Sequence, residues 1–203
     1  NSAEHYVFIS KLFLKLNDFF EKGALGKLEF ATLWVTENKK AFPNFEALKE
    51  LGALKTFKKI PSINSFLYEF YSMGAVRHGD YIAKVRVIPT EQTKNAITEK
   101  NIDIDSAEWP YRKGIIKEIA QKNLTFELQI QLCKDLKEMP VNDLTKEWSQ
   151  ELSPFRTVAK ITIPKQTVPE DGNFEIMENL SFTPFRTIEE NSPIGNLQRS
   201  RQS

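Results

Sequence analysis

An alternating run of apolar and polar residues, "LTFELQIQL" over residues 124–132, constrains the fold more than any other feature of the sequence. Successive side chains of a β-strand point to opposite faces of a sheet, so the run predicts a strand with one apolar and one polar face. We expect Phe126 and Ile130 to face inward, and Gln129 and Gln131 to face outward. A sheet of such strands has to cover its apolar face and protect its edges.

Three further segments complete the expected sheet. Residues 65–72 ("SFLYEFYS") and 81–89 ("YIAKVRVIP") also alternate, and residues 156–164 ("RTVAKITIP") form a β-branched run that ends in proline. Between them, "MGAVRHGD" over 73–80 predicts a turn, and "GIIKEIAQKN" over 114–123 predicts a short helix. Four antiparallel strands with a polar face and two open edges favour half of a barrel, or a sheet packed under helices.

The first 60 residues have a helical pattern instead. Apolar residues recur at every fourth position from 8 to 20, a second apolar segment covers about 25–35, and a third follows Asn44, a good N-cap. These features predict three helices. Residues 166–203 predict an irregular segment that wraps over the core, so the sequence as a whole predicts an α+β fold.

Composition narrows the function classes. The formal net charge of the 203 residues is +1, so we expect no nucleic acid partner and no charge-driven membrane binding. No apolar run approaches the about 18 residues of a membrane span, so we expect no membrane span. Cys133 is the single cysteine. A disulfide within the chain is therefore excluded, and a reducing compartment such as the cytoplasm is favoured.

The ends of the sequence indicate a longer parent protein. The first residue is Asn1 rather than methionine, and the final "QRSRQS" has no apolar residue that would close a core. We therefore expect further sequence beyond both ends.

Side chains for common site chemistries are scarce. Two histidines, His5 and His78, and Cys133 are too few for a structural zinc site, so we expect no metal site of that kind. We interpret His5 as a histidine at a helix end or core edge and His78 as a solvated turn residue. The sequence has no Gly-x-Ser-x-Gly motif and no Walker motif. The residues alone therefore indicate a soluble α+β domain and no particular reaction.

Four other conspicuous side chains have ordinary interpretations. We expect Trp148 and Phe182 to be packing residues, as most aromatic side chains are. We expect Lys84 and Arg86 to be charges on the surface of the sheet rather than partners of a bound anion, because long cations normally extend to water.

Three stretches, taken in order, resemble the small haem-dependent catalase-like proteins. Residues 71–89 resemble a strand, a turn ending in Gly-Asp and a second strand of that family, and residues 180–201 resemble its Phe-x-Pro…Pro-Leu-Gly-x-x-x-Arg-x-Arg ending. Between them, residues 124–166 carry the family's pattern at Met139, Pro140, Asp143, Thr145, Glu147, Trp148, Pro154, Val158, Ala159, Ile163, Pro164 and Gln166. The resemblance covers about residues 65–203.

The resemblance implies a fold and a domain organisation. Catalase-like proteins have an eight-stranded antiparallel barrel, with helices and a long wrapping loop that hold haem. The chain would then be a partial catalase-like domain, with a helical segment over 1–60, the second half of the barrel over 61–165 and the wrapping loop over 166–203. Closure of the barrel would protect the strand edges that the sequence alone leaves open.

The resemblance also implies site residues and a cofactor. In the family, a proximal tyrosine binds the haem iron four residues after an arginine that matches Arg201, and Arg199 is its neighbour in the motif. Such an arginine lowers the pKa of the tyrosine and favours an anionic ligand. The tyrosine would then follow Ser203, the distal histidine would precede Asn1, and Asn1 would match the distal asparagine. From the residues alone, Arg199 and Arg201 are equally well interpreted as solvated charges of a chain end.

Two functions follow as alternatives. The first is a fragment of a haem-dependent catalase or peroxidase-like enzyme that acts on hydrogen peroxide or an organic peroxide, and that can form a homo-oligomer. The second is a degenerate catalase-like domain without catalysis, with a binding or structural role. An unrelated α+β module that binds a lipid is a third, weaker interpretation.

Overall fold

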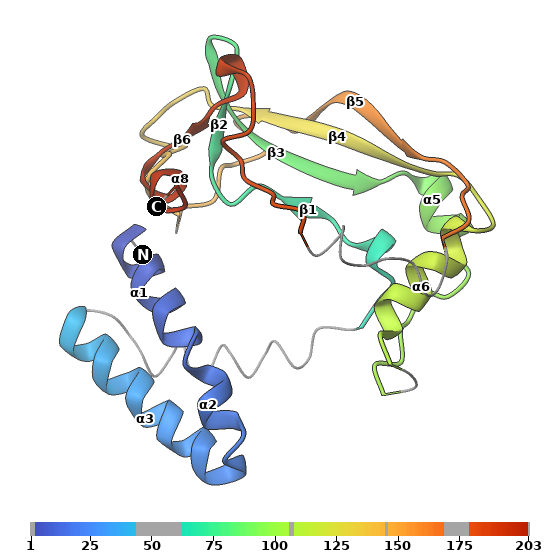
Figure 1. Ribbon diagram of the computed structural model, residues 1–203. Coiled ribbons are helices and arrows are strands. Elements are labelled where there is room, and N and C mark those ends of the chain that lie inside the picture. The colour runs from blue at the N-terminus through green and yellow to red at the C-terminus, as the bar shows by residue number, and fades with distance from the viewer. Residues whose placement is uncertain (1–2, 44–61, 106–107, 145, 169–178, 203) are drawn as a thin grey trace. The chain divides into compact units, whose positions relative to one another are not determined.

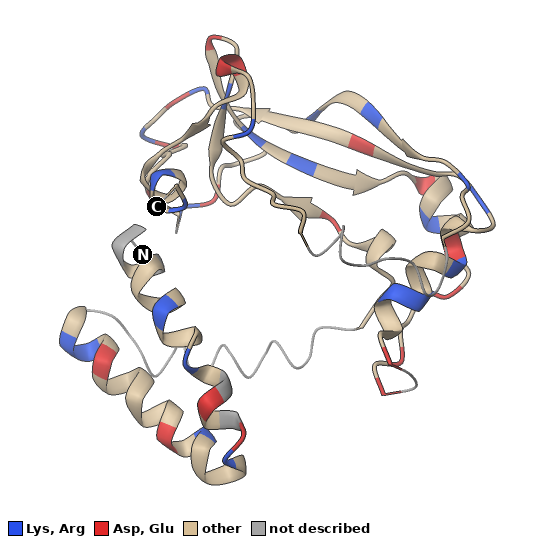
Figure 2. Cartoon of the chain, viewed as in Figure 1, with Lys and Arg blue, Asp and Glu red and all other residues tan. Residues whose placement is uncertain are grey.

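The computed structural model describes residues 3–43, 62–105, 108–144, 146–168 and 179–202. The chain divides into two compact units, Asn1–Pro61 and Ser62–Ser203, which are described separately. The organisation of the whole chain as one partial catalase-like domain stays a prediction. Acidic and basic residues are interspersed along the described part of both units (Figure 2).

The first unit is helical. Its described elements are α1 (Ala3–Phe13), α2 (Leu16–Phe20) and α3 (Gly23–Ala41). Leu12, Phe30 and Trp34 form its core. The apolar pattern over 8–20 predicts one helix, but the structure divides it into two between Phe13 and Leu16. The helix expected after Asn44 lies outside the described residues.

His5 lies at the edge of this core, as the sequence predicts. It is 6% exposed, and its Nε2 lies 3.0 Å from Oδ1 of the fully buried Asn38. The Asn38 amide in turn donates to the carbonyl of Trp34 at 2.8 Å. A histidine with such partners is well explained as a structural residue that joins α1 to α3.

None of the described helices of either unit is both long enough and apolar enough to cross a membrane.

The second unit is built on an antiparallel sheet (Figure 1). Its strands are β1 (Phe70–Tyr71), β2 (Ala75–His78), β3 (Tyr81–Pro89), β4 (Leu124–Leu132), β5 (Arg156–Ile163) and β6 (Pro193–Ile194). The order is β5-β4-β3-β2-β6, and β1 pairs with β3. The described strands form an open sheet in which β5 and β6 are the two edge strands, and this arrangement is compatible with half of a barrel.

Short helices lie at the two ends of this sheet. They are η1 (Ser65–Leu67), α5 (Glu91–Ala96), α6 (Pro110–Ile119), η2 (Glu189–Asn191) and α8 (Asn196–Ser200). Figure 1 shows α5 and α6 at one end of the sheet, and α8 at the other, beside β2 and β6. The core at the α5 and α6 end joins these two helices to β4, and it consists of Phe66, Ile97, Ile119, Leu124 and Phe126.

The strands expected over 81–89, 124–132 and 156–164 are confirmed, but the prediction over 65–72 is wrong in part. Ser65–Leu67 forms a 3-10 turn, and only Phe70–Tyr71 pairs as a strand. The reason is Asn64, which is fully buried and whose Oδ1 accepts a hydrogen bond from the Phe66 N–H at 3.1 Å. Such local bonds from asparagine compete with strand pairing.

The turn expected over 73–80 is also mostly wrong. Ala75–His78 is strand β2, and His78, which was expected in the turn, pairs with Tyr81. Only Gly79 and Asp80 connect β2 to β3, and Gly79 has φ +62°, which glycine adopts at low cost. The other glycine of the segment, Gly74, is buried and contacts the C-terminal part of the chain.

Glu118 ties α6 to the segment after α5. Its side chain is fully buried, and Oε1 accepts hydrogen bonds from the Thr98 N–H, the Thr98 hydroxyl and the Glu99 N–H at 2.8–3.1 Å. Its Oε2 lies 2.8 Å from the Lys122 ammonium. Burial raises the pKa of this carboxyl, but the Lys122 and backbone and hydroxyl donors outweigh it, so the pKa is lowered overall.

Candidate functional site

The C-terminal segment reaches the sheet by pairing with β2. Strand β6 pairs with β2, so that Ala75 faces Ile194. The pairing continues upstream, because the Arg77 N–H donates to the Ser192 carbonyl at 2.8 Å and the Gly79 N–H donates to the Glu190 carbonyl at 3.0 Å. The segment that leads into α8 is therefore held to the sheet by main-chain hydrogen bonds. The sequence predicted only an irregular segment here, because a two-residue strand has no alternation to detect.

The N-terminus of α8 is fixed by a glycine and an asparagine. Gly195 precedes the helix with φ +97°, and a Cβ at this position would lie 2.7 Å from Cγ1 of Val141. The Asn142 side chain accepts a hydrogen bond from the Asn196 N–H at 2.8 Å. The loop after β4 therefore supplies a cap that α8 does not carry itself.

One face of α8 is buried against the strand region. Leu197 and Gln198 are each 3% exposed, whereas Asn196 and Arg199 are exposed. The Gln198 side chain packs on Gly74, where a Cβ would lie 2.9 Å from its Nε2. This contact places the side chain of Gln198 directly on the backbone between β1 and β2.

The two predicted arginines lie at the C-terminal end of α8. Arg199 is in the last turn and Arg201 is the C-cap residue, and both are exposed. Arg201 donates from Nη1 to Oε1 of Gln198 at 3.5 Å. The third predicted residue, Asn1, lies outside the described residues. The roles of Asn1, Arg199 and Arg201 at a haem site stay predictions.

The polar face of β4 is covered, contrary to the prediction for Gln129 and Gln131. Gln131 is 2% exposed and its Nε2 donates to the carbonyls of Trp148 at 3.0 Å, Ser149 at 3.3 Å and Ser153 at 2.9 Å. The segment after β4 thus lies on the polar face of this strand, and the Gln131 amide is the hydrogen-bond donor to three main-chain carbonyls of the segment. Hydrophobic alternation cannot reveal this, because a glutamine that faces water and one that faces carbonyls look alike in sequence.

Lys84 lies under the same segment. Its Nζ is 4.6 Å from the ring centroid of Trp148, which is 2% exposed and donates from Nε1 to the Pro140 carbonyl at 2.9 Å. Burial lowers the pKa of Lys84, and the Glu147 carboxylate opposes this shift. Trp148 is therefore a packing residue as predicted, but Lys84 is half-buried by a cation–π contact and is not a fully solvated charge.

Arg86 is held in a similar way. Its guanidinium lies 4.1 Å over the Phe155 ring, and Nε donates to Oε1 of Gln129 at 2.6 Å. The Gln129 amide and the Thr157 hydroxyl both donate to Oε2 of Glu127 at 2.7 Å. These two bonds are the main causes of the lowered pKa of Glu127. The Arg86 side chain is therefore part of a polar network between β3, β4 and β5.

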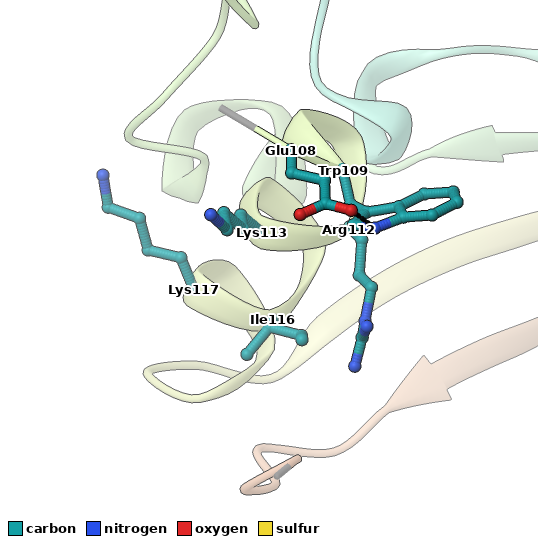
Figure 3. A pocket seen from close by; sticks show the side chains of 6 residues that line it. All are labelled: Glu108, Trp109, Arg112, Lys113, Ile116 and Lys117. Carbon is teal, nitrogen blue, oxygen red and sulfur yellow. Dashed lines mark hydrogen bonds between the residues drawn. The ribbon is translucent and has the colours of Figure 1, made fainter. Parts of the chain in front are cut away.

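Two of the hollows that described residues line in the second unit lie away from α8. One, of about 530 Å³, lies beside α6 and is lined by Glu108, Trp109, Arg112, Lys113, Ile116 and Lys117, whose side chains spread outward from the helix (Figure 3). The other, of about 210 Å³, includes Cys133, whose pKa is raised by burial. Neither is lined by α8.

The prediction that Phe182 is a packing residue is wrong, because its side chain is 89% exposed.

Among solved structures, the chain is similar to a fungal catalase, with a TM-score of 0.54 and 20% identity over 71% of this chain and 30% of that chain. It is also similar to catalase A from Saccharomyces cerevisiae, with a TM-score of 0.53 and 23% identity over 71% of this chain and 31% of that chain. The chain has a catalase-like fold. It spans about a third of the length of these catalases. No protein-family model matches the sequence, and no curated protein matches it.

Helix α8 contains no side chain that could bind haem iron. The helix, Asn196–Ser200, contains no tyrosine, histidine, cysteine or methionine, which are the side chains that bind haem iron. Within the described ranges, no cluster of three or more His, Cys, Asp or Glu side chains could hold a metal ion. The described part of the chain therefore supplies two arginines at the end of α8.

Sequence reasoning missed the residues that fix α8. Gly74, Asn142 and Gln198 were not selected, although glycines that interrupt an apolar segment are a general signal for close backbone approach. The partner of each glycine is distant in sequence. Only the fold shows that Gly74 faces Gln198 and that Gly195 faces Val141.

Proposed function

We propose that this chain is part of a haem-dependent catalase or peroxidase-like protein that acts on hydrogen peroxide or an organic peroxide. The distal histidine and the proximal tyrosine would belong to sequence outside residues 1–203. The observation that carries the proposal is the position of α8. A helix that ends in Arg199 and Arg201 is fixed to the edge of a sheet with a catalase-like fold.

The chain's own residues would act by position and charge. Arg201 is exposed at the C-terminal end of α8, so its guanidinium is available to a phenol on the segment that follows. A cation next to a phenol lowers the phenol's pKa by about 1–3 units and favours the anionic ligand form. Haem, when bound, would supply the redox chemistry of peroxide breakdown. Residues 195–201 would supply a fixed frame for its ligand.

A non-catalytic role is favoured by one observation. Strand β5 is at the end of the sheet, and its residues from Arg156 to Thr162 are exposed. No described strand pairs with its outer edge. An open edge of this length invites pairing with another strand. If the parent protein lacks the upstream half of a barrel, this edge would serve for binding or for assembly into a homo-oligomer.

Oxygen release from hydrogen peroxide tests the first proposal. The gene product with its natural flanking sequence is loaded with haem, and oxygen evolution and the peroxide-dependent oxidation of an organic donor are recorded. We expect one of the two activities, a clear reduction in Arg201→Leu, and no reduction in Arg156→Leu, which removes an exposed arginine at the start of β5. A haem-loaded protein without either activity would favour the non-catalytic role.

A further inference from the structure

Gln198 is an unusual residue for its place in α8. It is 3% exposed on a five-residue helix in which Asn196 and Arg199 are exposed and Ser200 is half-buried. Burial of an amide is unfavourable unless the amide is hydrogen-bonded. Its Oε1 accepts from Nη1 of Arg201. The buried amide therefore faces the arginine that the proposed function places beside a ligand.

Gly74 is a glycine for reasons of space and not of backbone conformation. The described glycines with positive φ are Gly23, Gly79 and Gly195, so the conformation of Gly74 is open to other residues. A Cβ at Gly74, however, would lie 2.9 Å from Nε2, 3.0 Å from Cγ and 3.1 Å from Cδ of Gln198. The clash extends along the outer half of the glutamine, so a side chain at position 74 would force this half to move.

The backbone of Gly74 is itself fixed to the sheet. It lies directly between β1 and β2, and the next residue, Ala75, is buried and pairs with Ile194 of β6. The path of the Gln198 side chain is therefore set by the sheet and not by α8 alone. Arg201 donates a hydrogen bond of 3.5 Å to this amide.

We infer that Gly74 and Gln198 are a positioning pair that holds the Arg201 guanidinium in one orientation at the end of α8. The inference deepens the proposed function, and it depends on that proposal only for the identity of the group that Arg201 faces. Gly74 supplies the space, Gln198 supplies the acceptor, and Arg201 supplies the charge. None of the three binds iron.

The first test measures Arg201 in the full chain without haem. The rate of modification by phenylglyoxal, which reacts with arginine, is followed at Arg201 by mass spectrometry, with the exposed Arg199 as an internal reference. Gln198→Leu keeps the volume and removes the acceptor, so we expect Arg201 to react about two- to fivefold faster, as for the loss of one weak hydrogen bond. Gln198→Glu keeps an acceptor and adds a charge, so we expect slower modification.

The second test separates positioning from simple packing. We expect Gly74→Ala to lower the melting temperature and to increase the reactivity of Arg201, whereas Met73→Ala, at an exposed neighbouring residue, changes neither. In the double variant of Gly74→Ala and Gln198→Ala the clash is relieved, so we expect the melting temperature to recover while Arg201 stays reactive. If the pair had a purely structural role, the melting temperature and the reactivity of Arg201 would both return to their values in the unchanged chain.

The outcomes distinguish this inference from the proposed function. If Arg201 responds as described but the natural protein never binds haem, the positioning pair stands and the proposed function falls. If haem binds but the reactivity of Arg201 is the same in Gln198→Leu, Gln198→Glu and the unchanged chain, the positioning pair is overturned. In the haem-loaded protein we also expect the absorption maximum to shift in Gln198→Leu and to be retained in Gln198→Glu.

Discussion

Replacement of Gln131 by leucine should release the segment after β4 from the sheet. Leucine has a similar volume, but it cannot donate the hydrogen bonds that the Gln131 amide makes to the carbonyls of Trp148 and Ser153, at 3.0 and 2.9 Å. Because the side chain is only 2% exposed, those carbonyls would face an apolar group. The substitution therefore tests whether this buried amide fixes the segment that carries Trp148.

The expected loss follows from these contacts. A net hydrogen bond contributes about 1 kcal/mol, and a carbonyl left unpaired costs about 1–3 kcal/mol unless water reaches it. Partial access of water to the loop reduces the second contribution, so we expect the free energy of unfolding to fall by about 2–4 kcal/mol. For a unit of this size, this corresponds to a decrease in melting temperature of about 5–15 °C.

Thermal unfolding followed by circular dichroism measures the effect. The matched control is Gln150→Leu, the same substitution at an exposed glutamine of the same segment. We expect the control to change the free energy of unfolding by no more than about 0.5 kcal/mol. Equal melting temperatures for Gln131→Leu and Gln150→Leu would refute the assignment of Gln131 as the residue that holds the segment.

Three further substitutions test other parts of the structure. The pKa of the Glu118 carboxyl is lowered in the folded state, so the carboxylate stabilises the fold above the ordinary glutamate pKa of about 4.3. This stabilisation is lost as the pH falls through the folded-state pKa. Urea unfolding should therefore show Glu118→Gln to be less stable than the unchanged chain at pH 7, with a smaller difference below about pH 4. Gly195→Ala combines a positive φ with a contact to Val141, so we expect a cost of about 1–3 kcal/mol and faster hydrogen exchange of α8 amides; unchanged exchange would contradict this. Arg77→Ala removes an exposed ion pair to Glu189 and should change the free energy of unfolding by less than about 1 kcal/mol in the same urea assay, so a larger loss would show that the pair is stronger than its exposure indicates.

The parts of the fold that the sequence predicts are those with long, regular patterns. Strands β3, β4 and β5 each have eight or nine residues, so alternation or β-branched composition identifies them. The two-residue strands β1 and β6 have no pattern to detect. At residues 65–67, the side-chain bond of one buried asparagine outweighs an alternation that would otherwise favour a strand.

The candidate site is predictable only in part. The resemblance selects Arg199 and Arg201, and the structure places both at the end of α8. The residues that fix them, Gly74 and Gln198, come together only through the pairing of β6 with β2. A contact between residues so distant in sequence is a consequence of topology, and local propensity contains no information about it.

A haem titration of the gene product with its natural flanking sequence, followed by absorption near the Soret band, tests the central claim most directly. The claim is that the sheet and α8 are part of a catalase-like barrel that surrounds haem. It predicts a saturable band and an altered spectrum in Arg201→Leu. A protein that is folded, by circular dichroism, but develops no Soret band on addition of haem would contradict it.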